Sequence, residues 1–99
     1  MVRHIVTWNH AESVPEGERA ANAKRLKAEL EALKNLIPGV VSITVRTDML
    51  PSSNRALMLD SLFESREALE GYITHPEHVR AGQFVRAVTQ DRACADYEE

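Results

Sequence analysis

The segment from Tyr72 to His78 holds three side chains that can exchange or donate a proton: Tyr72, His75 and His78. A neutral imidazole is a general base near neutral pH, and a tyrosine hydroxyl can donate a hydrogen bond to an oxygen that gains negative charge. A further imidazole, His4, lies near the amino terminus. These residue types predict proton transfer on an enolisable carbonyl compound, with His78 as the base and Tyr72 as the acid.

Other chemistries fit the residue pattern less well. His75 and His78 are three residues apart, but Pro76 between them breaks the helix that would align both rings, and no His-Glu-x-x-His motif or cysteine pair is present. The glycines are scattered, so no phosphate-binding loop is predicted. Cys94 has no sequence neighbour that would lower its pKa, so a packed thiol near a subunit interface is expected. We therefore predict no cofactor and no metal.

The polar side chains can meet only if their elements direct them into one cleft. Residues from Val2 to His10 alternate as a half-buried strand does, which places His4 on one face with Val6 and Trp8. Two helices are predicted later in the chain. One is capped by Ser65 and runs to Ile73 with Leu69, Tyr72 and Ile73 on one face; the other starts at Pro76 with His78, Ala81, Val85 and Val88 on a stripe beside Phe84.

Buried polar groups that converge in an apolar cleft are typical of a small-molecule site. The predicted ligand pocket consists of His4, Val6, Trp8, Leu26, Leu30, Leu57, Leu59 and Val85, with Tyr72 and His78 as candidate catalytic residues. In the structural alternative, Tyr72 and His78 satisfy each other or nearby backbone groups. An open cavity that reaches both side chains favours an enzyme, and a closed aliphatic core favours the structural role.

The remaining segments predict a long helix and further strands. Ser13 and Glu16 form a capping box that predicts the start of the first helix, and Pro38-Gly39 predicts its end, with Gly39 in a left-handed conformation. The apolar stripe of this helix is Ala23, Leu26, Leu30, Leu33 and Ile37. Strands are predicted at 40–47 and 55–63, as a hairpin, and at 90–97. The order indicates an α+β chain of the ferredoxin-like βαββαβ type.

One face of the predicted sheet lacks helices and yet is not uniformly polar. Ile5, Met58, Leu62 and Cys94 are the predicted apolar members of that face. Because an apolar sheet face is covered in a well-behaved protein, we expect a homodimer.

Length and composition narrow the class of protein. The 99 residues are predicted to form one domain, 1–99, and a net charge of −3 argues against nucleic acid as the main partner. No apolar run approaches the roughly 20 residues of a membrane span, and a single cysteine fits a reducing compartment. We expect a cytoplasmic protein with a small apolar carbonyl ligand and with neither nucleic acid nor membrane as partner.

Several segments resemble the stress-responsive A/B barrel (Dabb) family. They are His4-Ile5-Val6 with Trp8, Ile37-Pro38-Gly39-Val40, Phe63-Glu64-Ser65, Tyr72-Ile73-Thr74-His75-Pro76-Glu77-His78-Val79 and Asp96-Tyr97. The resemblance covers nearly the whole chain and implies a dimeric α/β barrel in which two four-stranded sheets pack face to face. Many members have no defined biochemical activity. The resemblance therefore implies a protein of undefined activity, with a cofactor-free enzyme on an enolisable carbonyl substrate as the alternative and the related quinol-type monooxygenases as a further one.

One plant member of this family is a polyketide cyclase that works without cofactor or metal. Its catalytic histidine and tyrosine match His78 and Tyr72, and its first-strand histidine matches His4. This chain departs from the cyclase at Leu57 in place of a histidine, Thr89 in place of a tryptophan, and aliphatic Leu26 and Leu30 in place of aromatic side chains. The resemblance therefore implies a pocket of different shape and a different substrate.

Overall fold

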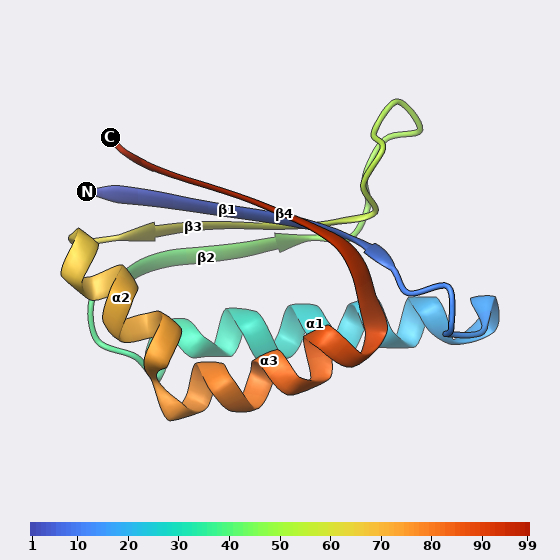
Figure 1. The fold of residues 1–99 in the computed structure, drawn as a ribbon, viewed down its shortest axis with the longest axis horizontal. Helices are drawn as coiled ribbons and strands as arrows, with labels where there is room; N and C mark the ends of the chain where they lie inside the picture. The colour runs from blue at the N-terminus through green and yellow to red at the C-terminus, as the bar shows by residue number, and fades with distance from the viewer.

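The computed structural model describes all 99 residues and has two layers, an antiparallel sheet and helices packed on one of its faces (Figure 1). The sheet has four strands in the order β2-β3-β1-β4. The strands are β1 (Val2–His10), β2 (Val40–Arg46), β3 (Leu57–Phe63) and β4 (Thr89–Glu98), and the helices are α1 (Arg19–Ala32), α2 (Arg66–Thr74) and α3 (Pro76–Val88). The predicted α+β, ferredoxin-like arrangement is confirmed.

The alternation of β1 determines which of its side chains lie beneath the helices. Val2, His4, Val6 and Trp8 are all buried, as predicted, and the intervening side chains are half-buried on the opposite face. Strand β3 alternates in the same way, with Leu57, Leu59, Ser61 and Phe63 buried. Because His4 lies directly opposite Ser61, the Ser61 hydroxyl donates a 2.7 Å hydrogen bond to the His4 carbonyl oxygen.

Helix α1 begins later than predicted. Glu16–Glu18 form a single 3-10 turn after Pro15, the α-helix starts at Arg19, and neither element has a side-chain cap. The predicted capping box is wrong because the backbone closes two separate tight turns there, Val14 N to Ala11 O and Glu18 N to Pro15 O. The predicted stripe is confirmed, since Ala23, Leu26, Leu30, Leu33 and Ile37 are buried.

Helices α2 and α3 meet at a sharp bend at His75. Ser65 caps α2 by accepting a hydrogen bond from the backbone N–H of Ala68, as predicted. His75 has an extended backbone (φ −64°, ψ 137°), and its Nδ1 caps α3 by accepting from the Glu77 N–H at 3.1 Å. The bend brings the end of α2 and the start of α3 to the same region above the sheet. Ile73 is 46% exposed, contrary to prediction, because it follows Tyr72 and turns away from the sheet.

The sheet face opposite the helices is uncovered in the single chain (Figure 1). Ile5, Met58 and Leu62 are half-buried there. The expectation that Cys94 joins them is wrong, because Cys94 pairs with Val6 and therefore points to the helix side. The backbone register of β4 decides this direction, and the alternation of residue types within β4 does not reveal the register.

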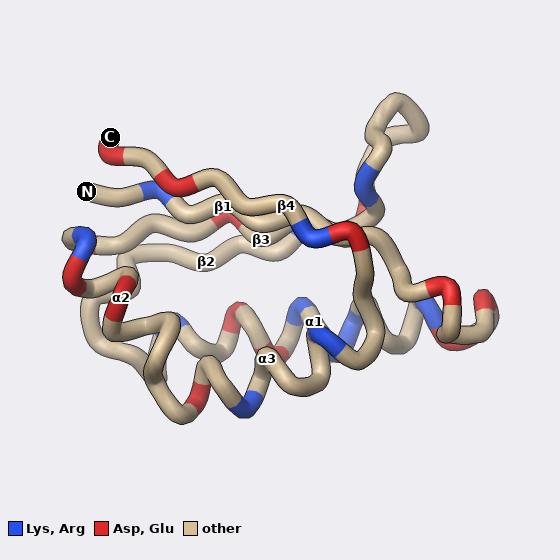
Figure 2. Tube along the Cα trace, in the orientation of Figure 1, with Lys and Arg blue, Asp and Glu red and all other residues tan.

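Charged positions of both signs occur along the chain, and the carboxyl-terminal ones, Asp96, Glu98 and Glu99, are all acidic (Figure 2). None of the helices is both long enough and apolar enough to span a lipid bilayer.

Candidate functional site

A cavity of about 230 Å³ lies between the sheet and the helices. The lining residues are His4, Val6, Trp8, Leu30, Leu59, Tyr72, His78, Gly82, Val85, Arg86 and Arg92. Leu26 and Leu57, which the sequence also places in the pocket, do not line the cavity because both are buried in the core.

His78 enters the cavity from the first turn of α3. Its Nδ1 lies 3.1 Å from the carbonyl oxygen of Ile73, and because a carbonyl oxygen only accepts, Nδ1 carries the proton. Burial lowers the pKa of His78 from its usual 6.5, the Ile73 hydrogen bond opposes this effect, and the nearby His4, Arg86 and Arg92 lower the pKa further. His78 is therefore a neutral imidazole at neutral pH, and its lone pair is on Nε2.

Tyr72 stands between the two imidazoles of the cavity. Its ring centroid lies 4.4 Å from that of His78 and 6.3 Å from that of His4. Burial raises the pKa of Tyr72 to about 12, so the hydroxyl keeps its proton and acts as a hydrogen-bond donor. The hydroxyl forms no hydrogen bond within the chain and is not sealed from the cavity. Since buried polar groups normally have partners, this hydroxyl is available to a ligand.

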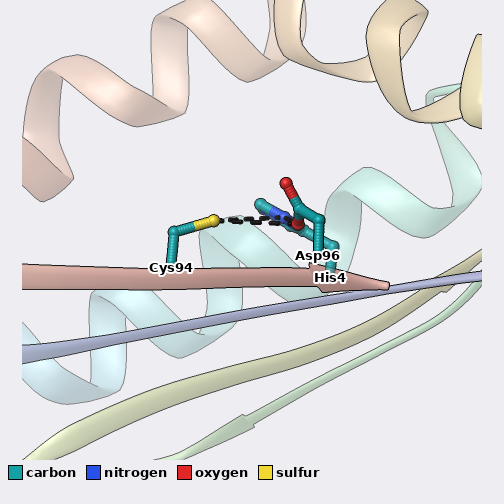
Figure 3. Close-up of side chains that lie close together, drawn as sticks. All are labelled: His4, Cys94 and Asp96. Atoms are coloured by element: carbon teal, nitrogen blue, oxygen red, sulfur yellow. Dashed lines mark hydrogen bonds and ion pairs between the residues drawn. The ribbon is translucent and has the colours of Figure 1, made fainter. Parts of the chain in front are cut away.

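Asp96 contacts the cavity residue His4, and acid–base reasoning from the sequence missed this contact. It lies directly opposite His4 on the neighbouring strand β4, so the two side chains share a face. A short hydrogen bond joins His4 Nδ1 to Asp96 Oδ1, and Figure 3 shows both side chains on the helix side of the strands. The carboxylate holds the proton on Nδ1 and leaves Nε2 of His4 unprotonated in the neutral ring.

Cys94 completes a cluster with His4 and Asp96. Its Sγ lies 3.8 Å from His4 Nδ1 and 3.7 Å from Asp96 Oδ1, and one ligand atom from each residue lies within 4.8 Å of the others (Figure 3). Such side chains can bind zinc. Two features disfavour a cation: burial and Asp96 raise the pKa of the Cys94 thiol, and the positive Arg92 lies nearby. We therefore infer that the role of Cys94 and Asp96 in this cluster is to orient His4.

Two arginines at the cavity were also missed. Arg86 comes from α3 and Arg92 from β4. The sequence could have indicated that Arg86 lies at the cavity, because His78, Gly82 and Arg86 follow one another at steps of four residues along one helix face. Arg92 had no such signal, since its direction depends on the register of β4.

The other two histidines do not line this cavity. His75 is a helix-entry residue, because its side chain caps α3. His10 is half-buried, and burial together with the charge of Arg19 lowers its pKa.

Comparisons with known proteins identify the family of this chain. The model of the Stress responsive A/B Barrel Domain (Dabb) matches residues 2–99. A dimeric protein of unknown function with a ferredoxin-like fold from Bacteroides fragilis is 35% identical, with a TM-score of 0.90 over 99% of this chain and 95% of that chain. A hydroxynitrile lyase from Passiflora edulis is 17% identical, with a TM-score of 0.80 over 97% and 90%, which is a likeness of fold.

Among curated proteins, RING finger protein 207 of Homo sapiens is 32% identical over 71 residues, which are 71% of this chain and 11% of that protein. The match thus spans about a tenth of that relative. The family model, by contrast, matches all but the first residue of this chain. The chain therefore belongs to the stress-responsive A/B barrel domain (Dabb) family, whose ferredoxin-like members include proteins of unknown function.

Proposed function

We propose that the protein is a homodimeric, cofactor-free enzyme whose cavity binds a small carbonyl compound and transfers a proton at its α-carbon. One observation carries the proposal: Nε2 of His78 and the hydroxyl of Tyr72 have no partner within the chain, and both side chains line the cavity. A purely structural pair would use these atoms in hydrogen bonds of its own. Here only Nδ1 of His78 is used, and it donates to Ile73.

The reaction begins with removal of the α-proton. Nε2 of His78 takes this proton, the electron pair of the C–H bond forms the enolate double bond, and the carbonyl oxygen gains the negative charge. The Tyr72 hydroxyl donates a hydrogen bond to that oxygen. Return of a proton from the His78 imidazolium to carbon restores the ketone without any change of oxidation state. General bases of this kind contribute about 10²–10⁴ in rate, and oxyanion donors about 10²–10³.

His4 is a positioning residue in this scheme. Its ring meets the Tyr72 ring edge-on, at an interplanar angle of 68°, and Asp96 fixes the orientation of the imidazole. Phe63 supports Tyr72 from another side, with 4.8 Å between ring centroids. These contacts restrict the Tyr72 ring, so the hydroxyl needs little reorganisation when charge develops on the substrate oxygen.

The homodimer is supported by the uncovered sheet face and by the dimeric Bacteroides fragilis relative. Ile5, Met58 and Leu62 lie half-buried on that face in a single chain. A second copy packed face to face would remove them from water, which favours association.

Proton exchange on a neutral ketone tests the enzymatic proposal. In deuterium oxide, proton NMR of phenylacetone follows the loss of its α-protons. We expect the protein to accelerate exchange above the buffer rate, and we expect His78→Gln and Tyr72→Phe each to reduce that acceleration by about 10²-fold or more. His10→Gln is the matched control, because His10 does not line the cavity. No acceleration by the folded protein, or an undiminished rate in His78→Gln, would contradict the proposal.

A further inference from the structure

We infer that the substrate is a small oxo acid, a carbonyl compound with an apolar body and a carboxylate that Arg86 and Arg92 bind. The inference rests on the proposed function, because it names the substrate class of the same cavity. It adds an anion-binding role for two residues that the proton-transfer scheme does not use.

Arg86 and Arg92 lack a carboxylate partner, and among the arginines without one they are the two that line the cavity. Ion pairs to Asp or Glu are formed by Arg3, Arg25, Arg66 and Arg80. Neither Arg86 nor Arg92 takes part in such a pair, although the chain has 15 acidic and 12 basic residues. Acidic partners are therefore not scarce. Two guanidinium groups at one cavity remain free to bind an external anion.

The two guanidinium groups approach the cavity from different walls. Arg86 belongs to α3, and Arg92 belongs to β4, on the same strand face as Cys94 and Asp96. Gly82 leaves room for Arg86, because a Cβ atom at position 82 would lie 3.1 Å from Arg86 Nη1. Planar guanidinium groups match the geometry of a carboxylate and can donate two parallel hydrogen bonds to it.

The remaining lining residues indicate the chemistry of the other end of the ligand. Val6, Trp8, Leu30, Leu59 and Val85 are buried and apolar, and they suit a hydrocarbon or aromatic body. Both arginines lie close enough to His78 to lower its pKa by their charge. An anion held by them would thus lie near the proposed base, and would offset the charges that depress this pKa. A single-ring acid is of suitable size for the cavity volume of about 230 Å³.

Binding of benzoate and benzamide to the intact protein tests the inference, because the two probes share shape and differ in charge. Amide NMR titrations would locate the site and give the affinities. We expect benzoate to perturb cavity residues and to bind at least tenfold more tightly than benzamide at low salt, with the advantage shrinking as salt is added. The pKa of His78 should rise when benzoate is bound. Arg86→Gln and Arg92→Gln should each reduce benzoate affinity several-fold and reduce benzamide affinity by less.

Arg46→Gln is the matched control, because it removes the same charge outside the cavity. Arg86→Lys keeps the charge and should retain part of the benzoate preference. Equal affinity for benzoate and benzamide, or an Arg46→Gln effect as large as that of Arg86→Gln, would overturn the oxo acid inference and leave the proposed function standing. Binding of neither probe in the cavity of the folded protein would overturn the proposed function as well.

Discussion

The Tyr72 hydroxyl has no hydrogen bond to lose within the chain, although the residue is 1% exposed. Tyr72→Phe should therefore change the free energy of unfolding by less than about 0.5 kcal/mol. Ser61→Ala is the control, because the buried Ser61 hydroxyl donates to His4 O at 2.7 Å, and its removal should cost about 0.5–1.5 kcal/mol. Urea denaturation of both variants measures the difference. A Tyr72→Phe loss as large as that of Ser61→Ala would show that the hydroxyl has a structural partner.

Local patterns in the sequence were sufficient to predict that His4, Tyr72 and His78 lie in one cleft. The period of a strand or helix decides which way a side chain faces, and these three residues lie on apolar faces. Asp96 and Arg92 could not be found in this way, because the register between β1 and β4 directs them. That register depends on backbone pairing between residues 79 to 96 positions apart, which residue types in one strand do not specify.

At the scale of elements, the turn between α1 and β2 depends on Gly39. Its φ is +84°, as the sequence predicts, and a Cβ atom there would lie 2.6 Å from the Cβ of Ala68 in α2. Gly39→Ala should therefore cost about 1 kcal/mol or more, from backbone strain and from the clash with α2.

Gly71→Ala provides the comparison for Gly39→Ala. Gly71 lies within α2, and a Cβ atom there meets nothing within 4 Å, so alanine should stabilise the helix by up to about 1 kcal/mol. Thermal and urea unfolding of the two variants should shift in opposite directions. A Gly39→Ala protein as stable as the wild type would refute the assigned role of this turn.

The start of α1 shows why local signals fail at element ends. Ser13 and Glu16 have the spacing of a capping box, yet the α-helix starts at Arg19. Capping preferences are worth about 1 kcal/mol, and here the tight turns around Pro15 take precedence. The buried stripe from Ala23 to Ile37 was predictable because many residues contribute to it.

For the whole molecule, the uncovered sheet face should be the dimer interface. Met58→Asp places a charge on that face and should yield monomer or unfolded protein, because removing a charge from water is costly. Leu50→Asp is the control, since Leu50 is 73% exposed in the loop between β2 and β3. Light scattering after gel filtration should give a dimer for the wild type and Leu50→Asp. A folded wild-type monomer at micromolar concentration would contradict the homodimer.

The proposed function requires a neutral base in the cavity, His78, whose Nε2 has no partner in the chain. Nitrogen-15 NMR of the histidine rings across pH measures this state directly. We predict that His78 carries its proton on Nδ1 at neutral pH, that Nε2 gives the signal of an unprotonated nitrogen, and that the ring becomes charged only below its usual pKa of 6.5, because burial lowers this pKa. A His78 ring that is charged at neutral pH, or that carries its proton on Nε2, would contradict the proposed function.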